Sequence, residues 1–279
     1  AEVEYQDHTS TTVFVRFPVL RDAAGKAPPN PMSVVIWTTT PWTLPGNRAV
    51  AVAPMHQYVR VRVVAAGEKS LARVGEEFFV AEPLFDSVKK ETSAELEVVS
   101  RGPGSKLAGM VLAHPFRAKD GESLEVPLLP ADFVDMETGT GFVHIAPGHG
   151  MDDFILGQKH GIEIPQTVGE DGRFYAGVPR FAGKHVYEVA DEVCAALIEQ
   201  GVLLGRNKLQ HSYPHSWRSK APLIFRTTRQ WFIAMDKNDL RTKALAEIDR
   251  VRWVPDQGKN RIWAMIAARS EEHTSELQS

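Results

Sequence analysis

The 279-residue sequence contains one cysteine, Cys194, and this scarcity limits the chemistry that the chain can use. A single thiol cannot form an internal disulfide or a zinc site built from several cysteines. Cys194 lies beside a stripe of apolar residues at helical spacing, which is typical of a small core residue. Because proteins of reducing compartments use few disulfides, we expect a cytoplasmic protein.

Long apolar runs and a strong net charge are also missing. No apolar run approaches the roughly 18 residues of a membrane span, and no signal peptide is visible. The formal net charge of −3 creates no global field for nucleic acid, so any RNA contact must use local basic patches. The composition is that of an ordinary globular protein. No membrane contact and no protein partner is indicated, and we expect a monomer.

One stretch, WTTTPWTLPGN from Trp37 to Asn47, places hydroxyl groups where a strand ends. The apolar run that leads into it predicts a buried strand, which stops where three threonines meet a proline. Threonine also favours strands for its own sake, so the hydroxyls alone do not establish a site. The residues concerned are Thr38, Thr39, Thr40 and Pro41, followed by a second Trp-Thr pair, Trp42 and Thr43.

A second stretch, GTGFVHIAPGHGMDDF from Gly139 to Phe154, combines histidines and aspartates. The Pro-Gly pair between His144 and His149 excludes the shared helical face that zinc proteases use. A histidine on a strand is more often a packed residue than a ligand. One of Asp152 and Asp153 is explained by the preference of a helix start for acids; the other is a candidate anion for a cationic substrate group.

Both stretches resemble the editing (CP1) domain of the isoleucyl-tRNA synthetase family, of class I and bacterial type. Valyl and leucyl relatives carry Thr-Thr-Arg-Pro where this chain has Thr39, Thr40, Pro41 and Trp42. The resemblance implies hydrolysis of valine wrongly esterified to the isoleucine tRNA, whose acceptor end is the expected partner. Gly46 replaces the usual alanine, and we expect little effect because we predict a loop there.

The resemblance also implies a role for each site residue. Asp153 would hold the α-ammonium group of the amino acid, and His144 would refuse isoleucine by its bulk. Threonine hydroxyls would hold the attacking water, since they donate and accept hydrogen bonds at once. The predicted catalytic residues are Thr38, Thr39, Thr40 and Asp153, and the predicted substrate-binding residues are His144, Trp42, Thr43 and Asp153.

No cofactor or metal site is expected in this chain. Nothing matches the His-Ile-Gly-His or Lys-Met-Ser-Lys-Ser signatures that bind ATP in the family. ATP and Mg²⁺ would therefore act only in a longer parent enzyme, of which we expect this chain to be a fragment that does not activate amino acids. Two other function classes remain open: a non-catalytic RNA-binding fragment, and a metallohydrolase that uses His144, His149, Asp152 and Asp153.

Many short strands separated by glycine and proline predict a closed or strongly bent β structure. The resemblance implies a mixed α/β, β-rich fold that is barrel-like with peripheral helices, as in the editing domains of the family. Residues 12–19 alternate at period two, as in a half-buried strand, and 185–200 show helical spacing. Further short strands are predicted around 48–53, 58–64, 71–80 (a pair), 95–100, 109–114, 124–129 and 142–145, with helices near 83–91 and from 151 onward.

After Gly205 the chain becomes basic and aromatic, which suits either an RNA contact or a polar ribbon between domains. We predict a strand in 221–235 and a helix over 239–250, and the family has cysteine where this chain has Ser216. The resemblance assigns 1–205 to the editing domain and 206–268 to the return connection and the start of the second half of the nucleotide-binding domain. Residues 269–279 resemble the translation of a sequencing-library adaptor, and we expect them to be an artefact.

Overall fold

The computed structural model describes residues 3–117, 123–229 and 234–268. They belong to two compact units, Ala1–Thr227 and Thr228–Ser279. Both of the motif-bearing stretches lie in the first unit. The predicted artefact at 269–279 lies outside the described residues. No helix among the described residues is long and apolar enough to cross a membrane.

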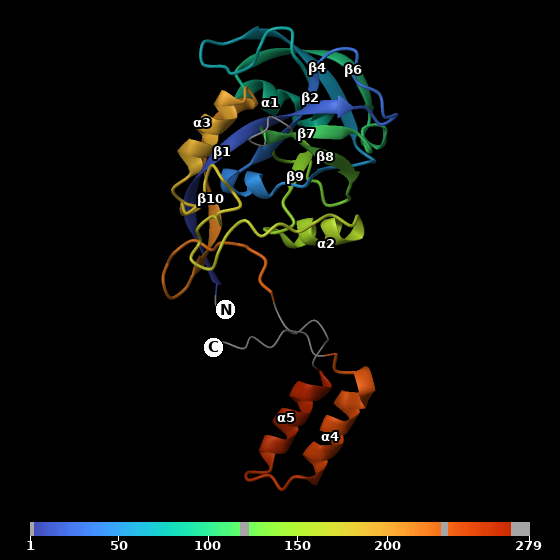
Figure 1. Ribbon diagram of the computed structural model, residues 1–279, viewed down its shortest axis with the longest axis vertical. Coiled ribbons are helices and arrows are strands. Elements are labelled where there is room, and N and C mark those ends of the chain that lie inside the picture. Colours follow the sequence, from blue (N-terminus) through green and yellow to red (C-terminus); the bar gives the residue numbers. More distant parts are fainter. Residues whose placement is uncertain (1–2, 118–122, 230–233, 269–279) are drawn as a thin grey trace. The chain divides into compact units, whose positions relative to one another are not determined.

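The described residues of the first unit form a ten-stranded sheet (Figure 1). Its order is β6-β4-β5-β2-β1-β7-β8-β3-β9, and β10 pairs with β1 beside this path. Strand β1 is central because it pairs in turn with β10, β2 and β7 along its length. The strands are β1 (Val3–Arg21), β2 (Met32–Thr38), β3 (Ala49–Val52), β4 (Gln57–Ala66), β5 (Glu77–Ala81), β6 (Ala94–Pro103), β7 (Val111–Arg117), β8 (Ser123–Pro130), β9 (Phe142–Ile145) and β10 (Leu203–Ser216).

The sheet bends so that β9 returns toward β4 and β5. The Ala81 N–H at the end of β5 donates to the Thr140 carbonyl at 2.8 Å, and the Tyr58 hydroxyl donates to the Gly141 carbonyl at 2.6 Å. Gly141 has a φ of +79°, and an added Cβ would lie 2.2 Å from the Ala81 Cβ, so only glycine permits this approach. The predicted β-rich, strongly bent fold is confirmed.

The interior of β1 is buried on both faces, so the prediction of a half-buried strand is wrong. Phe17 and Val15 pack in the cluster that contains Leu197 of α3 (Ala190–Glu199), whereas Phe14 packs in a second cluster with Val61 of β4. The period-two pattern predicted that one face of this strand is exposed to solvent. Instead, a buried cluster packs against each face, and a strand between two layers is apolar on both faces.

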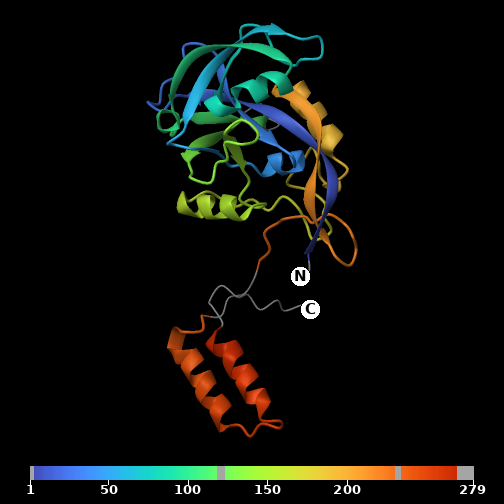
Figure 2. The same cartoon turned by 180° about the vertical axis from the view of Figure 1, so that it is seen from behind.

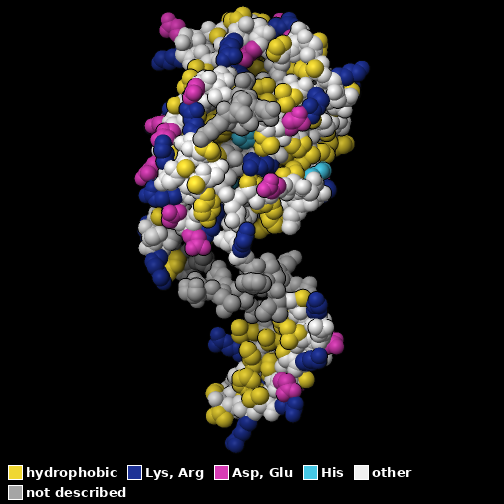
Figure 3. Space-filling model, in the orientation of Figure 1, with side chains coloured by type: hydrophobic (Ala, Val, Ile, Leu, Met, Phe, Trp, Pro, Cys, Tyr) yellow, Lys and Arg dark blue, Asp and Glu magenta, His cyan; other side chains and the backbone are white. Residues whose placement is uncertain are grey.

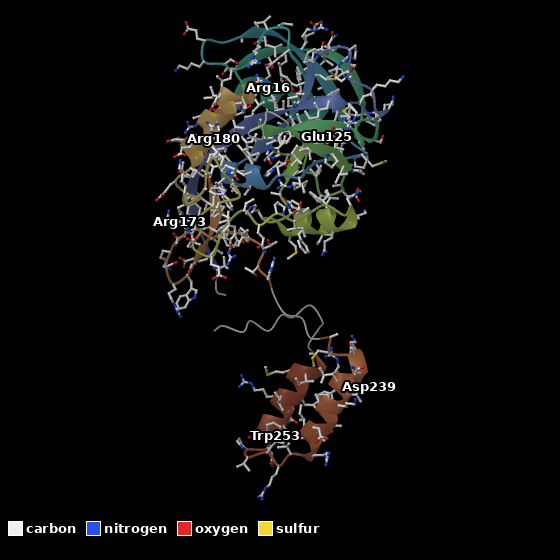
Figure 4. The ribbon with its side chains drawn as sticks, in the orientation of Figure 1. Arg16, Glu125, Arg173, Arg180, Asp239 and Trp253 are labelled. Carbon is white, nitrogen blue, oxygen red and sulfur yellow. The ribbon has the colours of Figure 1, made fainter. Side chains whose placement is uncertain are left out.

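Arg16 is the charged residue inside this buried stretch of β1 (Figure 4). Its guanidinium donates to both carboxylate oxygens of Glu76, at 2.8 and 2.7 Å, and to the carbonyls of Leu203 and Leu71. A bidentate pair with further backbone acceptors is the arrangement in which a buried arginine is tolerated. Arg16 thereby joins β1 to the segment before β5 and to the start of β10.

Helices cover the sheet at separate places (Figures 1 and 2). The helix predicted over 185–200 begins only at Ala190, because His185 pairs with Arg173 in an isolated bridge and is held outside the helix. The helical elements of the first unit are η1 (Pro41–Gly46), η2 (Glu82–Leu84), α1 (Phe85–Glu91), η3 (Gly104–Lys106), α2 (Met151–Lys159) and α3.

Two predicted strand assignments differ from the structure. The pair expected at 71–80 is a turn followed by β5 alone, because Glu76 bonds back to Arg73 through both its main chain and its side chain. Residues 221–229 form no strand, although Pro222 makes an isolated bridge. Proline offers no N–H to extend that bridge into a ladder. The part of this prediction at 230–233 lies outside the described residues.

Most of the basic, aromatic segment after Gly205 belongs to β10, which ends at Ser216 and pairs with β1 from Val3↔Ser216 to Val15↔Leu203. The first compact unit therefore runs past residue 205. The assignment of 206–268 to a return connection stays a prediction.

The described residues of the second unit form a helical hairpin of α4 (Leu240–Arg250) and α5 (Gln257–Ala267), preceded by η4 (Lys237–Asp239). The helix predicted over 239–250 is confirmed. The Arg241 guanidinium donates to the Ile266 carbonyl at 2.6 Å and so joins the two helices. None of the described residues of this unit is buried, and apolar side chains lie on its surface (Figure 3).

Candidate active site

The threonine loop, residues 38–43, begins at Thr38, the last residue of β2. It runs into the 3-10 helix η1, which starts at Pro41. The Thr40 N–H donates to the Thr38 hydroxyl at 3.1 Å, and the hydroxyls of these two threonines lie 3.3 Å apart. Thr38 is buried, whereas Thr39 and Thr40 are half-buried. The Thr39 hydroxyl makes no hydrogen bond to another described residue, so it remains available to a water molecule or a substrate.

His144 is held by a chain of hydrogen bonds that reaches the threonine loop. The Asn47 amide donates one N–H to the Ala49 carbonyl and the other to His144 Nδ1, at 2.8 and 3.1 Å. The second ring nitrogen, Nε2, must then carry the proton and donate to the Thr43 hydroxyl at 2.7 Å. Thr43 in turn donates to the Thr40 carbonyl at 2.8 Å. One tautomer of His144 satisfies every bond.

Burial lowers the pKa of His144 to about 3, and the neighbouring His149 and His114 add to the effect. The imidazole is therefore neutral at any physiological pH. A neutral ring with both nitrogens occupied is suited to shaping a pocket wall. It is not placed to act as a general base.

Asp153 lies in the first turn of α2, close after β9. Its Oδ2 accepts the Ala146 N–H at 2.8 Å, and its Oδ1 accepts none of the hydrogen bonds from other described residues. Burial raises the Asp153 pKa to about 6, and the charge of Asp152 acts in the same direction. Gly150 lies against this carboxylate, since an added Cβ would be 2.9 Å from the carboxylate carbon and would displace the Asp153 side chain. Asp152 is exposed, as suits a helix start.

His149 joins the loop after β9 to two other segments. Its Nε2 lies 2.7 Å from the Thr167 hydroxyl, and its Nδ1 lies 2.9 Å from the Phe225 carbonyl. Trp42 packs edge-on against the His149 ring, with centroids 5.1 Å apart. The prediction of a loop at Gly46 is wrong: this glycine is buried in η1, and an alanine there would approach His149 at 3.1 Å.

The structure thus connects Thr40, Thr43 and His144 directly, and the carboxylate of Asp153 in α2 accepts the N–H of Ala146, the residue that follows the strand of His144. Sequence reasoning missed Asn47, which is fully buried and sets the histidine tautomer. The sequence signal that could have pointed to Asn47 as a site residue is its place at the end of the WTTTPWTLPGN stretch.

Metal ligation by these residues finds little support. Within the described part of the chain, no three His, Cys, Asp or Glu side chains are grouped as a metal site requires. The ring nitrogens of His144 and His149 are all engaged in hydrogen bonds to protein groups. A metal ion bound by these histidines, as the metallohydrolase hypothesis requires, would have to replace these hydrogen bonds.

A cavity of about 420 Å³ opens beside the threonine loop. Its walls come from that loop, from the β1–β10 pair and from the segment before α3. The lining includes Thr39, Thr40, Pro41, Trp42, His8, Ser10, Tyr187 and Tyr213.

Comparison with known proteins gives this geometry a family. Residues 1–275 match the family of tRNA synthetases class I (I, L, M and V). The chain belongs to the class I tRNA synthetases. The resemblance predicted from the two stretches is thereby confirmed.

Within this family the chain is similar to isoleucine–tRNA ligases. It is 46% identical to that of Gluconobacter oxydans over 97% of this chain and 30% of the relative, and 48% identical to that of Nitratidesulfovibrio vulgaris over 97% and 28%. The chain therefore spans less than a third of the length of these curated relatives.

The fold has a matching structural neighbour. The cytosolic leucyl-tRNA synthetase editing domain of P. knowlesi superposes with a TM-score of 0.53 at 11% identity, over 71% of this chain and 96% of that domain. At this identity the likeness establishes the fold alone. The barrel-like synthetase editing fold predicted from the sequence is the fold observed.

Proposed function

We propose that this chain is the editing part of an isoleucine–tRNA ligase and hydrolyses the ester between valine and the isoleucine tRNA. The observation that carries the proposal is the hydrogen-bond chain Asn47–His144–Thr43–Thr40, which fixes a neutral imidazole in one orientation next to the threonine loop. The acceptor end of tRNA would be the partner and the cytoplasm the location, with the chain acting as a monomer.

The α-ammonium group of the esterified amino acid would bind the free oxygen of Asp153. This carboxylate is partly desolvated, and a charge-assisted hydrogen bond is strong in such a setting. The ammonium would also favour the ionised carboxylate and so offset the cost of its burial.

The side chain of the amino acid would face His144. Valine and isoleucine differ by one methylene, which a hydrophobic pocket distinguishes by roughly 1–3 kcal/mol, as is well known for this pair. A ring fixed at both nitrogens cannot yield to the larger side chain without breaking a buried hydrogen bond. His144 would thus admit valine and exclude isoleucine.

Water would be held by the hydroxyls of Thr39 and Thr40, with Thr38 orienting Thr40. An aminoacyl ester is already activated, and the free hydroxyl of the terminal adenosine can assist the water. Positioning and hydrogen bonding then supply the rate enhancement without a strong general base. In a parent enzyme, attachment of isoleucine to tRNA would use ATP and Mg²⁺ bound elsewhere.

The test is deacylation of Val-tRNA and Ile-tRNA, both made on the isoleucine tRNA, by this chain. We expect hydrolysis of the valyl ester and not of the isoleucyl ester. Hydrolysis of both would contradict the size sieve. If neither is hydrolysed, valyl-adenosine is the next substrate: its hydrolysis would locate the failure in tRNA binding, and its stability would contradict the proposed site.

A further inference from the structure

The cavity beside the threonine loop has a second wall that the hydrolytic chemistry does not use. This wall is one face of the β1–β10 pair. Because His8 lies opposite His211 in the register, and side chains alternate along a strand, both rings point to the same side of the pair. Ser10 lies on that side as well, with its hydroxyl 2.9 Å from His211 Nε2.

The rings of this wall form a continuous aromatic surface. The His8 ring lies 5.3 Å from the Tyr213 ring, 5.7 Å from the His215 ring and 6.4 Å from the His211 ring, measured between centroids. Tyr213 and His215 are buried, whereas His8 is half-buried and lines the cavity. The surface that a ligand would meet is therefore His8 with Tyr213 behind it.

Hydrogen bonds hold this wall in place. The Tyr213 hydroxyl donates to the Leu223 carbonyl at 3.0 Å, and the Tyr187 hydroxyl donates to the Pro222 carbonyl at 2.8 Å. Both tyrosines line the cavity with their hydroxyls already occupied. They offer ring surface in a fixed orientation, which lowers the entropy that binding must overcome.

The lining is also uncharged. Among the residues that the structure describes, the lining contains no carboxylate, lysine or arginine. Burial, together with His215 and His211, lowers the pKa of His8. A phosphate or an ammonium group would find no partner of opposite charge here. A flat, neutral heterocycle would find aromatic rings on one side and threonine and serine hydroxyls at the rim.

We propose that this cavity stacks a nucleobase of the unpaired RNA strand that leads to the esterified nucleotide. The proposal rests on the proposed function, in which Thr39 and Thr40, two residues of the lining of this cavity, hold the water that attacks the ester. Stacking on rings is tolerant of base identity, as a general editing step on one strand end requires. The site would orient the strand without touching the ester.

The test compares His8→Leu, which removes the ring, with His8→Phe, which keeps it. Tyr5→Leu is the matched control, because Tyr5 lies on the other face of β1 and is exposed. The substrates are a valylated RNA hairpin with an unpaired 3′ strand, and valyl-adenosine. We expect His8→Leu to raise the KM for the hairpin by roughly 5- to 100-fold while leaving valyl-adenosine hydrolysis unchanged. His8→Phe and Tyr5→Leu should behave as the unsubstituted chain.

A second readout is independent of hydrolysis. An uncharged hairpin carries a fluorescent purine analogue next to its terminal adenosine, and stacking on rings should quench the emission. We expect quenching with the unsubstituted chain and with His8→Phe, and its loss with His8→Leu.

These outcomes separate the two proposals. Hydrolysis of valyl-adenosine without quenching, and with an unchanged KM in His8→Leu, would overturn the stacking site and leave the editing function standing. Quenching that depends on the His8 ring, without hydrolysis of either ester, would support the site and contradict the function. An equal loss of hydrolysis for both substrates in His8→Leu would place the esterified adenosine itself in the cavity and overturn the proposal as stated.

Discussion

At the scale of single residues, the site contains a buried group that lowers the stability of the folded chain and is placed to bind the substrate. This group is Asp153, because burial raises its pKa to about 6 and only one of its oxygens accepts a hydrogen bond from another residue. A carboxyl with a raised pKa in the folded state makes folding less favourable as pH rises through the interval between the two pKa values.

We therefore predict opposite effects of Asp153→Asn on stability and on activity. Above about pH 6 the variant should be more stable than the unsubstituted chain by up to about 3 kcal/mol, because it avoids burying a charge. This advantage should shrink as pH falls below about 6 and disappear below the ordinary aspartate pKa. Thermal unfolding followed across this pH range measures it.

Activity should move the other way. Without the anion, kcat/KM for the valyl ester should fall by roughly 30-fold or more. In the unsubstituted chain, hydrolysis above the uncatalysed background should rise as pH increases through about 6, when Asp153 ionises. A variant that is both more stable and fully active would remove Asp153 from the site.

The second residue-scale prediction concerns Thr43, whose hydroxyl accepts a hydrogen bond from His144 Nε2–H and donates one to the Thr40 carbonyl. Thr43→Val keeps the shape but leaves the buried Nε2–H of His144 without an acceptor, which should destabilise the fold by about 1–3 kcal/mol. The Thr40 carbonyl keeps its bond from the Thr43 N–H. We also expect the ring to lose its fixed orientation and hydrolysis of Ile-tRNA to appear. Denaturant unfolding and deacylation measure the two effects.

Thr43→Ser is the matched control, because it keeps the hydroxyl and removes one methyl group. It should retain most of the rejection of isoleucine. If Thr43→Val rejects isoleucine as well as Thr43→Ser does, the hydrogen-bond chain does not position the sieve.

At the scale of elements, β10 is the strand whose position the sequence left most open. Its basic and aromatic residues suited a linker, yet it pairs along most of β1 and contributes Tyr213 to the cavity. The segment that follows β10 is hydrogen-bonded to the loop between β9 and α2, since the Thr227 N–H donates to the Gly148 carbonyl at 2.9 Å. Strand β10 is thus part of the same sheet as β2, the strand that leads into the threonine loop.

We predict that a chain ending at residue 205 will not fold cooperatively. It would lose most of β10 and leave the first half of β1 without its partner, with unpaired backbone groups along that edge. Circular dichroism and thermal unfolding of residues 1–205, compared with residues 1–227, would show the difference. A sharp transition of equal midpoint in both would mean that β10 adds nothing to the first unit.

At the scale of the whole molecule, every contact described for the site lies within Ala1–Thr227. The second unit is a hairpin without buried residues in its described part, and large apolar side chains such as Trp263 are exposed on it (Figure 3). Its helices supply none of the groups of the site.

Residues 1–227 should accordingly hydrolyse valyl-adenosine at the rate of the full chain, within about twofold, and unfold at the same temperature. The comparison needs only the two chains and one small ester. A shorter chain that folds but loses hydrolysis would show that the second unit contributes to the site, contrary to this expectation.

Local signals in the sequence determined a good part of this protein. The two stretches with their prolines and glycines defined the strand ends of β2 and β9, the start of α2 and the family, because such residues restrict the backbone wherever they occur. The sequence also predicted the helices α1, α3 and α4 near their observed places, and the apolar spacing over 185–200 predicted α3 except for its start.

Only the tertiary structure decided what depends on residues far apart in the chain. That β1 is buried on both faces, that Asn47 sets the tautomer of His144, and that Gly46 lies against His149 are consequences of a bent sheet. The sheet brings together segments separated by about a hundred residues. Burial and hydrogen-bond partners are properties of that arrangement, and a linear pattern records only which groups are available to take part in it.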